Sequence, residues 1–92
     1  MPTINTEGIL AEVANERVRQ DRKWGLQNHV PHKWLVILME EVGEASQAVL
    51  QRDRLKCRQE LVQVAAVAVG AIESLDRNQW MEGGKEEIGA DD

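Results

Sequence analysis

The sequence is poor in the residues that stabilise many small proteins through covalent links or an aromatic core. Cys57 is the only cysteine, so an internal disulfide and a zinc site built on several thiolates are both excluded. Phe and Tyr are absent, and the three aromatic residues are all Trp. Neither Asn-Gly nor Asp-Gly occurs, and no run alternates between apolar and polar residues, so β-hairpins are not predicted. The residues available for a core are Ala, Val, Leu and Ile, which favours packed helices.

Positive charge and long apolar runs are also scarce. The net charge is −5, and most of it belongs to the segment from Glu82, which holds five acidic residues and one lysine. The rest of the chain offers no basic surface for a phosphate backbone, so nucleic acid is not an expected partner. No stretch approaches ~18 uninterrupted apolar residues, so no membrane-spanning segment is expected. Because residues 1–8 show no signal-peptide pattern either, we expect a cytoplasmic protein.

Apolar residues recur at helical spacing along most of the chain, which predicts an all-α fold. Gly25 is a suitable end for the first helix, and Pro31 disfavours continued helix at the residue before it. Asp53 is a suitable N-cap for the third helix. The three predicted helices run from about residue 5 or 6 to 23, from about 32 to 51, and from about 54 to 77.

We expect one domain, residues 1–81, followed by a flexible acidic tail, residues 82–92. A chain of this length buries only a little over ~60% of its unfolded surface, so the core of one protomer would be thin. Association with a second copy would bury more apolar surface. The sequence therefore predicts a three-helix protomer that joins another subunit in a larger helical bundle, as a homodimer or tetramer.

All three predicted helices carry apolar stripes that should face the core, and the stripe on the second helix is formed by Leu38, Val42, Ala45 and Val49. The stripe on the first helix is formed by Ile9, Leu10, Val13, Ala14 and Val18. The stripe on the third helix is formed by Leu61, Val64, Ala65, Ala68, Ile72 and Leu75.

Two further rows contain core residues together with acceptor side chains. The row on the second helix consists of Trp34, Ile37, Glu41, Glu44 and Ala48. The row on the third helix consists of Glu60, Gln63, Val67, Gly70 and Ser74. Since residues three or four apart share a helix face, the acids of both rows should lie beside the core.

Carboxylates that meet in a partly dry place are costly unless a cation neutralises them. Mg²⁺ prefers oxygen ligands and shares its coordination sphere with substrate phosphates, and Mn²⁺ could substitute for it. The acids therefore predict a magnesium site.

Two other interpretations of these acidic residues stand beside the magnesium site. Acidic side chains on helices usually form a solvated face. Inward Glu residues also occur in di-iron bundles, which need a Glu-x-x-His pair that neither His29 nor His32 provides.

Two acidic motifs lie fifteen residues apart, Glu40-Glu41-Val-Gly-Glu44 and Glu60-Leu-Val-Gln63. They resemble the EExxE…ExxD signature of the all-α nucleotide pyrophosphatases, the MazG-like superfamily. The lead-in to the first motif and the stretch from Arg19 to His29 also resemble small MazG-like proteins that are often found in phages. The resemblance covers about residues 12–75.

The resemblance implies an Mg²⁺-dependent enzyme that hydrolyses a nucleoside triphosphate between the α and β phosphates, giving a monophosphate and pyrophosphate. It also implies a dimer or tetramer whose active site could draw on more than one subunit. By motif position, the metal ligands would be Glu41, Glu44 and Glu60. Glu40 would be a supporting acid in the catalytic set, and Gln63 would be a further metal ligand.

Gln63 departs from the family pattern, which commonly has Asp at this position. Its amide oxygen can still ligate Mg²⁺, but it brings no charge to the site. One alternative to an enzyme is therefore a non-catalytic nucleotide-binding or metal-binding module with a weakened site. Another is a purely structural helical interaction protein.

Residues around the first connection are candidates for binding the nucleotide. Trp24 could stack on the base, and Asn28 with His29 could contact the base and sugar. Trp24 could equally close the end of the bundle, and Asn28 could satisfy local backbone groups. The cations that could contact the triphosphate are Arg17, Arg22 and Lys23, and the alternative role for each is to compensate the helix dipole.

Overall fold

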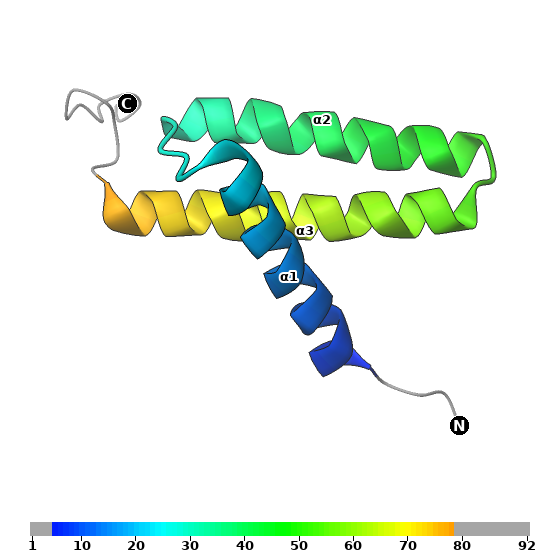
Figure 1. Ribbon diagram of the computed structural model, residues 1–92. Coiled ribbons are helices and arrows are strands. Elements are labelled where there is room, and N and C mark those ends of the chain that lie inside the picture. Colours follow the sequence, from blue (N-terminus) through cyan, green and yellow to red (C-terminus); the bar gives the residue numbers. More distant parts are fainter. Residues whose placement is uncertain (1–4, 79–92) are drawn as a thin grey trace.

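The computed structural model describes residues 5–78, which form three helices and no strand (Figure 1). The helices are α1 (Thr6–Trp24), α2 (Pro31–Leu50) and α3 (Arg54–Arg77). The prediction of an all-α protomer with three helices is confirmed for this part of the chain. The predicted acidic tail, residues 82–92, lies outside the described residues. Within residues 5–78, no helix combines the length and the apolar character that a membrane span requires.

The helices begin and end where the local sequence favours it. α1 ends at Gly25, whose φ of 75° is open to glycine without strain. α2 begins at Pro31, just before the predicted start, because the fixed φ of proline suits the first helical position. The Asp53 carboxylate accepts a hydrogen bond of 3.0 Å from the Lys56 N–H, so the predicted cap of α3 is confirmed.

α2 and α3 lie side by side and antiparallel, whereas α1 crosses α3 and projects beyond the pair (Figure 1). The C-terminal half of α1 lies over α3, and its N-terminal end points away from the other two helices. The crossing therefore brings the end of α1 close to the middle of the α2–α3 pair, where the acidic motifs lie.

This crossing decides which residues of α1 are buried. The stripe from Ile9 to Val18 was predicted to face the core, but Ile9 and Leu10 are 42% and 60% exposed. The residues of α1 that are buried are Val13, Arg17 and Gln20. They are four and three positions apart, so they form a single line along α1. This line is the part of α1 that contacts α3. The predicted stripe is wrong except at Val13, because a crossing helix buries a line rather than a broad face.

The inward face of α3 is the row that contains polar groups. Its buried residues are Glu60, Val67, Gly70 and Ser74, with Ala66 beside them. Leu61 and Ile72, which were predicted to face the core, are 55% and 58% exposed. Gly70 has no side chain and Ser74 has a small one, so neighbouring groups such as the Arg17 guanidinium can approach α3 closely along this row. The acceptor groups of α3 are consequently carried into the interior of the protomer.

Candidate functional site

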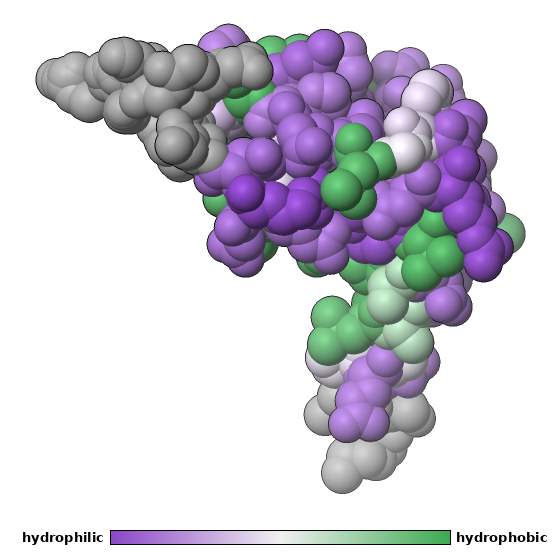
Figure 2. Space-filling view, turned by 60° about the vertical axis from the view of Figure 1, so that its left-hand side comes forward, coloured by the Kyte–Doolittle hydropathy of each residue, from purple (hydrophilic) through white to green (hydrophobic). Residues whose placement is uncertain are grey.

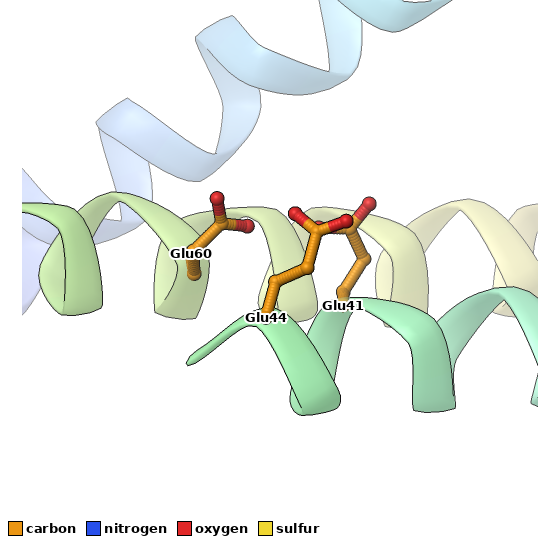
Figure 3. A group of neighbouring side chains, drawn as sticks. All are labelled: Glu41, Glu44 and Glu60. Carbon is orange, nitrogen blue, oxygen red and sulfur yellow. The ribbon is translucent and has the colours of Figure 1, made fainter. Parts of the chain in front are cut away.

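Glu41 and Glu44 of α2 converge with Glu60 of α3 where these helices pack against each other (Figure 3). Each residue offers one carboxylate oxygen, and the three oxygens lie within 4.8 Å of one another. Glu41 and Glu44 are about one helical turn apart, so their side chains emerge on the same side of α2. The meeting of acids from two neighbouring helices, which the sequence predicted, is present in the structure.

The three carboxylates are close enough together for a magnesium ion to draw them into its coordination sphere. In an octahedral Mg²⁺ site with bonds of about 2.1 Å, opposite oxygens are about 4.2 Å apart. The observed limit of 4.8 Å is only slightly wider. Because Glu44 is exposed, its side chain can rotate inward without disturbing the packing. A set of charged oxygen donors also suits a hard cation such as Mg²⁺ or Mn²⁺.

Glu60 supplies the second sign of a cation site. The residue is only 7% exposed, and its Oε1 atom is buried without a hydrogen-bond partner among the described residues. Its Oε2 atom lies 3.4 Å from the ammonium of Lys56, whose side chain is 52% exposed. A buried carboxylate oxygen with no partner costs free energy. A cation between the three carboxylates would remove this cost.

Burial and the neighbouring carboxylates also change the pKa of Glu41. Burial, a hydrogen bond to Glu60 and repulsion from the neighbouring glutamates, in this order of size, together raise its pKa to about 7. A proton on Glu41 therefore neutralises part of the cluster when no metal is bound. Because a proton and a cation relieve the same repulsion, they should compete for the site.

This competition predicts a pH dependence of stability. Folded Glu41 holds its proton up to about pH 7, whereas its ordinary pKa is 4.5. Between these values the folded protein binds more protons than the unfolded chain, so the contribution of Glu41 to stability falls as pH rises through this window. We expect Mg²⁺ to remove this decline, because the ion favours the ionised carboxylate. Urea unfolding at several pH values, with Mg²⁺ and with a chelator, measures the effect.

The control for this experiment is Glu41→Gln, which keeps the shape of the side chain but cannot titrate. The control is needed because burial and Lys33 lower the pKa of His29, which contributes with the opposite sign. The difference between wild type and variant isolates Glu41. An identical pH profile for both proteins without metal would contradict the assignment.

The carboxylates form one side of a cleft of about 440 Å³. On the α1 side, the cleft is lined by Arg19, Lys23 and Trp24. Arg19 is paired with Glu16 at 2.6 Å, whereas Lys23 forms no ion pair within residues 5–78 and lies 4.8 Å from the centre of the Trp24 ring. The remaining lining residues are Gln20, Gln27, Trp34, Ile37, Gln63 and Val67. The cleft thus brings a cation and an indole of α1 together with the acids of α2 and α3.

Other candidate residues do not line this cleft. Arg17 is buried between α1 and α3, where its guanidinium pairs with Glu73 at 2.6 Å. The Asn28 amide oxygen accepts hydrogen bonds from Arg77 and Asn78. The candidates outside the cleft are Arg17, Arg22, Asn28, His29 and Glu40. Of the residues predicted to bind a nucleotide, only Lys23 and Trp24 line the cleft in the described part of the chain.

Six cleft residues were not among the sequence candidates for the site, and four of these six have polar or aromatic side chains. Trp34 is 6% exposed, its ring packs edge-on against that of His29, and its indole nitrogen has no partner among the described residues. Its place in the row with Glu41 could have indicated it. Arg19 and Gln20 lie four positions before Lys23 and Trp24, which places them on the same face of α1. Gln27 carried no signal, because it belongs to a connection without periodic structure.

Comparisons of the chain with models of protein families, with curated proteins and with solved structures found no match.

Proposed function

We propose that this chain binds Mg²⁺ through Glu41, Glu44 and Glu60 and hydrolyses nucleoside triphosphates to a nucleoside monophosphate and pyrophosphate. The observation that carries the proposal is the buried Oε1 of Glu60, which lies beside two further carboxylates and has no hydrogen-bond donor among the described residues once Glu41 is ionised. A structural cluster of acids would be expected to pair each buried oxygen with a donor. The cation of α1 across the cleft provides the complementary group for an anionic substrate.

In this proposal the carboxylates bind the metal ion, and the residues of α1 contact the nucleotide. When bound, Mg²⁺ would supply charge neutralisation and polarisation of the phosphoryl groups. Lys23 would contact the phosphate oxygens, because it is the lining cation without a carboxylate partner in the described chain. Trp24, which is 60% exposed, would stack on the base. Glu40 is exposed beside Glu41, where its charge helps to raise the pKa of Glu41.

We further propose that the protomer assembles into a homodimer or tetramer. Leu35, Val36 and Met39 are each about three-fifths exposed on α2. Leu55 and Leu61 are also exposed beside a hollow of about 400 Å³ near the α2–α3 turn. Apolar side chains also appear on the projecting α1 in Figure 2. Exposed apolar surface of this extent is typical of an interface. Sedimentation of the protein at micromolar concentration tests this proposal, and a monomer would contradict it.

The function is tested by assaying pyrophosphate release from a panel of ribo- and deoxyribonucleoside triphosphates. We expect turnover with Mg²⁺ or Mn²⁺ and a return to the uncatalysed rate when a chelator removes the metal. Glu12→Gln is a matched control, because it removes one negative charge from a residue of α1 that does not line the cleft. It should retain the wild-type rate.

Two results would contradict different parts of the proposal. Nucleotide and Mg²⁺ binding without pyrophosphate release would leave a binding module. Neither binding nor turnover would leave a helical interaction protein. Thermal unfolding separates these cases, since a ligand at a hundredfold excess over its Kd stabilises the folded state by about 2.7 kcal/mol.

A further inference from the structure

A network of amide and charged side chains next to the acidic cluster connects α1 to α3. The Gln20 amide nitrogen donates to Gln63 Oε1 at 3.1 Å and to Glu16 Oε2 at 3.3 Å. The Gln20 amide oxygen accepts a hydrogen bond of 3.0 Å from Arg17 Nη1. Gln20 is buried, with an exposed fraction of 9%. All its polar atoms therefore have partners inside the protein, and one partner is Gln63.

Arg17 and Glu16 fix the orientation of the Gln20 amide, and Gln20 in turn fixes that of Gln63. Arg17 can only donate hydrogen bonds, so the Gln20 oxygen must face it. Ionised Glu16 can only accept, so the Gln20 nitrogen must face Glu16 and, with its second hydrogen, Gln63. Gln63 must then present its oxygen to Gln20. This oxygen is the only atom of Gln63 that could ligate a metal ion, and its orientation and one of its two lone pairs are committed to Gln20 on α1.

We propose that Gln63 is a positioning residue, which holds α1 over the carboxylates through Gln20, and that it is not a ligand of the metal ion. This inference rests on the proposed magnesium site. It differs from the role that the family resemblance implies for this position. The ligand set from the protein would then consist of Glu41, Glu44 and Glu60 alone, with waters and substrate oxygens completing the coordination sphere.

An amide suits this position better than a carboxylate would. Arg19 lowers the pKa of Glu16 most strongly, burial opposes this, and a hydrogen bond from Gln63 lowers the pKa further. Gln63 thus accepts a hydrogen bond from Gln20, and its amide hydrogens are available to stabilise ionised Glu16. An acid at position 63 could not donate, and its charge would face the carboxylate of Glu16. The departure from Asp is consistent with a residue that serves the α1–α3 contact.

The hydrogen bond between Gln20 and Gln63, here called the tether, should affect the part of the cleft that α1 contributes. Gln20 lies one turn before Lys23 and Trp24 on the same helix, so the position of these two residues depends on how α1 is held. The carboxylates belong to α2 and α3, and they do not depend on α1 for their placement. Loss of the tether should weaken nucleotide binding and leave the binding of Mg²⁺ alone unchanged.

The test uses calorimetric titration of the full-length protein, first with Mg²⁺ alone and then with a non-hydrolysable nucleoside triphosphate and Mg²⁺. The proteins are wild type, Gln63→Leu, Gln20→Leu and the double variant. We expect the Kd for Mg²⁺ alone to stay within about twofold in all four. We expect each single variant to weaken nucleotide binding about two- to tenfold, the range expected for one hydrogen bond. The double variant should bind the nucleotide no more weakly than Gln20→Leu does, because both substitutions remove the same hydrogen bond.

A ligand role gives a different pattern. If Gln63 ligates the ion, Gln63→Leu should weaken the binding of Mg²⁺ alone by about tenfold or more, while Gln20→Leu should leave it unchanged. That result would overturn the proposal. Additive losses of nucleotide affinity in the double variant would also overturn it, because they would show that the two amides act independently.

A third measurement separates failure of this inference from failure of the proposed function. Urea unfolding of the same four proteins without ligands gives the coupling between the two amides directly. If wild type binds neither Mg²⁺ nor nucleotide, the proposed function fails, and coupled effects on the unfolding equilibrium constant would still support the tether. If wild type binds both ligands but the unfolding effects are additive, the tether fails and the metal site stands.

Discussion

Glu60→Gln is expected to abolish measurable Mg²⁺ binding while leaving the metal-free protein at least as stable as wild type. Removing a carboxylate ligand should weaken Mg²⁺ affinity by at least about 100-fold, since changes to groups that merely orient ligands already cost ~10–100-fold. Pyrophosphate release should fall by a similar factor. The stability change has the opposite sign, because the variant removes a buried charge whose Oε1 has no partner among the described residues.

Isothermal titration with Mg²⁺ and urea unfolding of the same samples measure the two effects. Glu12→Gln is again the matched control, because it removes the same charge from an exposed ion pair with Arg58. It should change neither Mg²⁺ affinity nor turnover. A Glu60→Gln protein that is markedly less stable than wild type without metal would show that Glu60 serves the fold instead of an ion.

Arg17→Met should destabilise the contact between α1 and α3. The guanidinium donates to Glu73 at 2.6 Å and to Asp21 at 2.9 Å, and it lies against Gly70, where a Cβ atom would come within 3.2 Å of it. Because Glu73 and Asp21 are partly exposed, water can replace some of these bonds in the variant. We expect a loss of about 1–2 kcal/mol in the free energy of unfolding, below the cost of breaking a fully buried pair.

Arg58→Met is the matched comparison for this prediction. Arg58 also joins α3 to α1, through two hydrogen bonds of 2.8 Å to Glu12, but both side chains are exposed. Its removal should cost much less, because exposed ion pairs are screened by water and salt. Urea unfolding in low and high salt compares the two variants. Equal losses would mean that burial of Arg17 adds nothing to its contacts.

The helices and their ends were predictable because their signals are local. Gly25, Pro31 and Asp53 each act through their own backbone geometry or side chain, without help from distant residues. The convergence of Glu41 with Glu60 was also predictable, since acids inside two core-directed rows must meet if the helices pack. The rows alone indicated where the acids lie, and the resemblance to the EExxE…ExxD pattern is the source of the chemistry that we propose for them.

The path of α1 was not predictable, because it depends on contacts between residues far apart in the chain. Arg17 was interpreted as a phosphate contact or a dipole partner, yet its principal partner is Glu73 on α3. The sequence contains both residues but no signal that pairs them. The same applies to the hydrogen bond between Gln20 and Gln63, because the sequence indicated Gln63 only as a metal ligand. Exposure of Ile9 and Leu10 follows from this crossing.

The central claim is that Glu41, Glu44 and Glu60 hold one divalent cation between α2 and α3. Crystals grown with Mn²⁺ test it most directly, because the anomalous scattering of manganese locates the ion without reference to the protein geometry. We expect an anomalous peak bonded to oxygens of all three glutamates, with the side chain of Glu44 turned inward. A peak elsewhere, or carboxylates that point into solvent with no ion between them at saturating Mn²⁺, would contradict the claim.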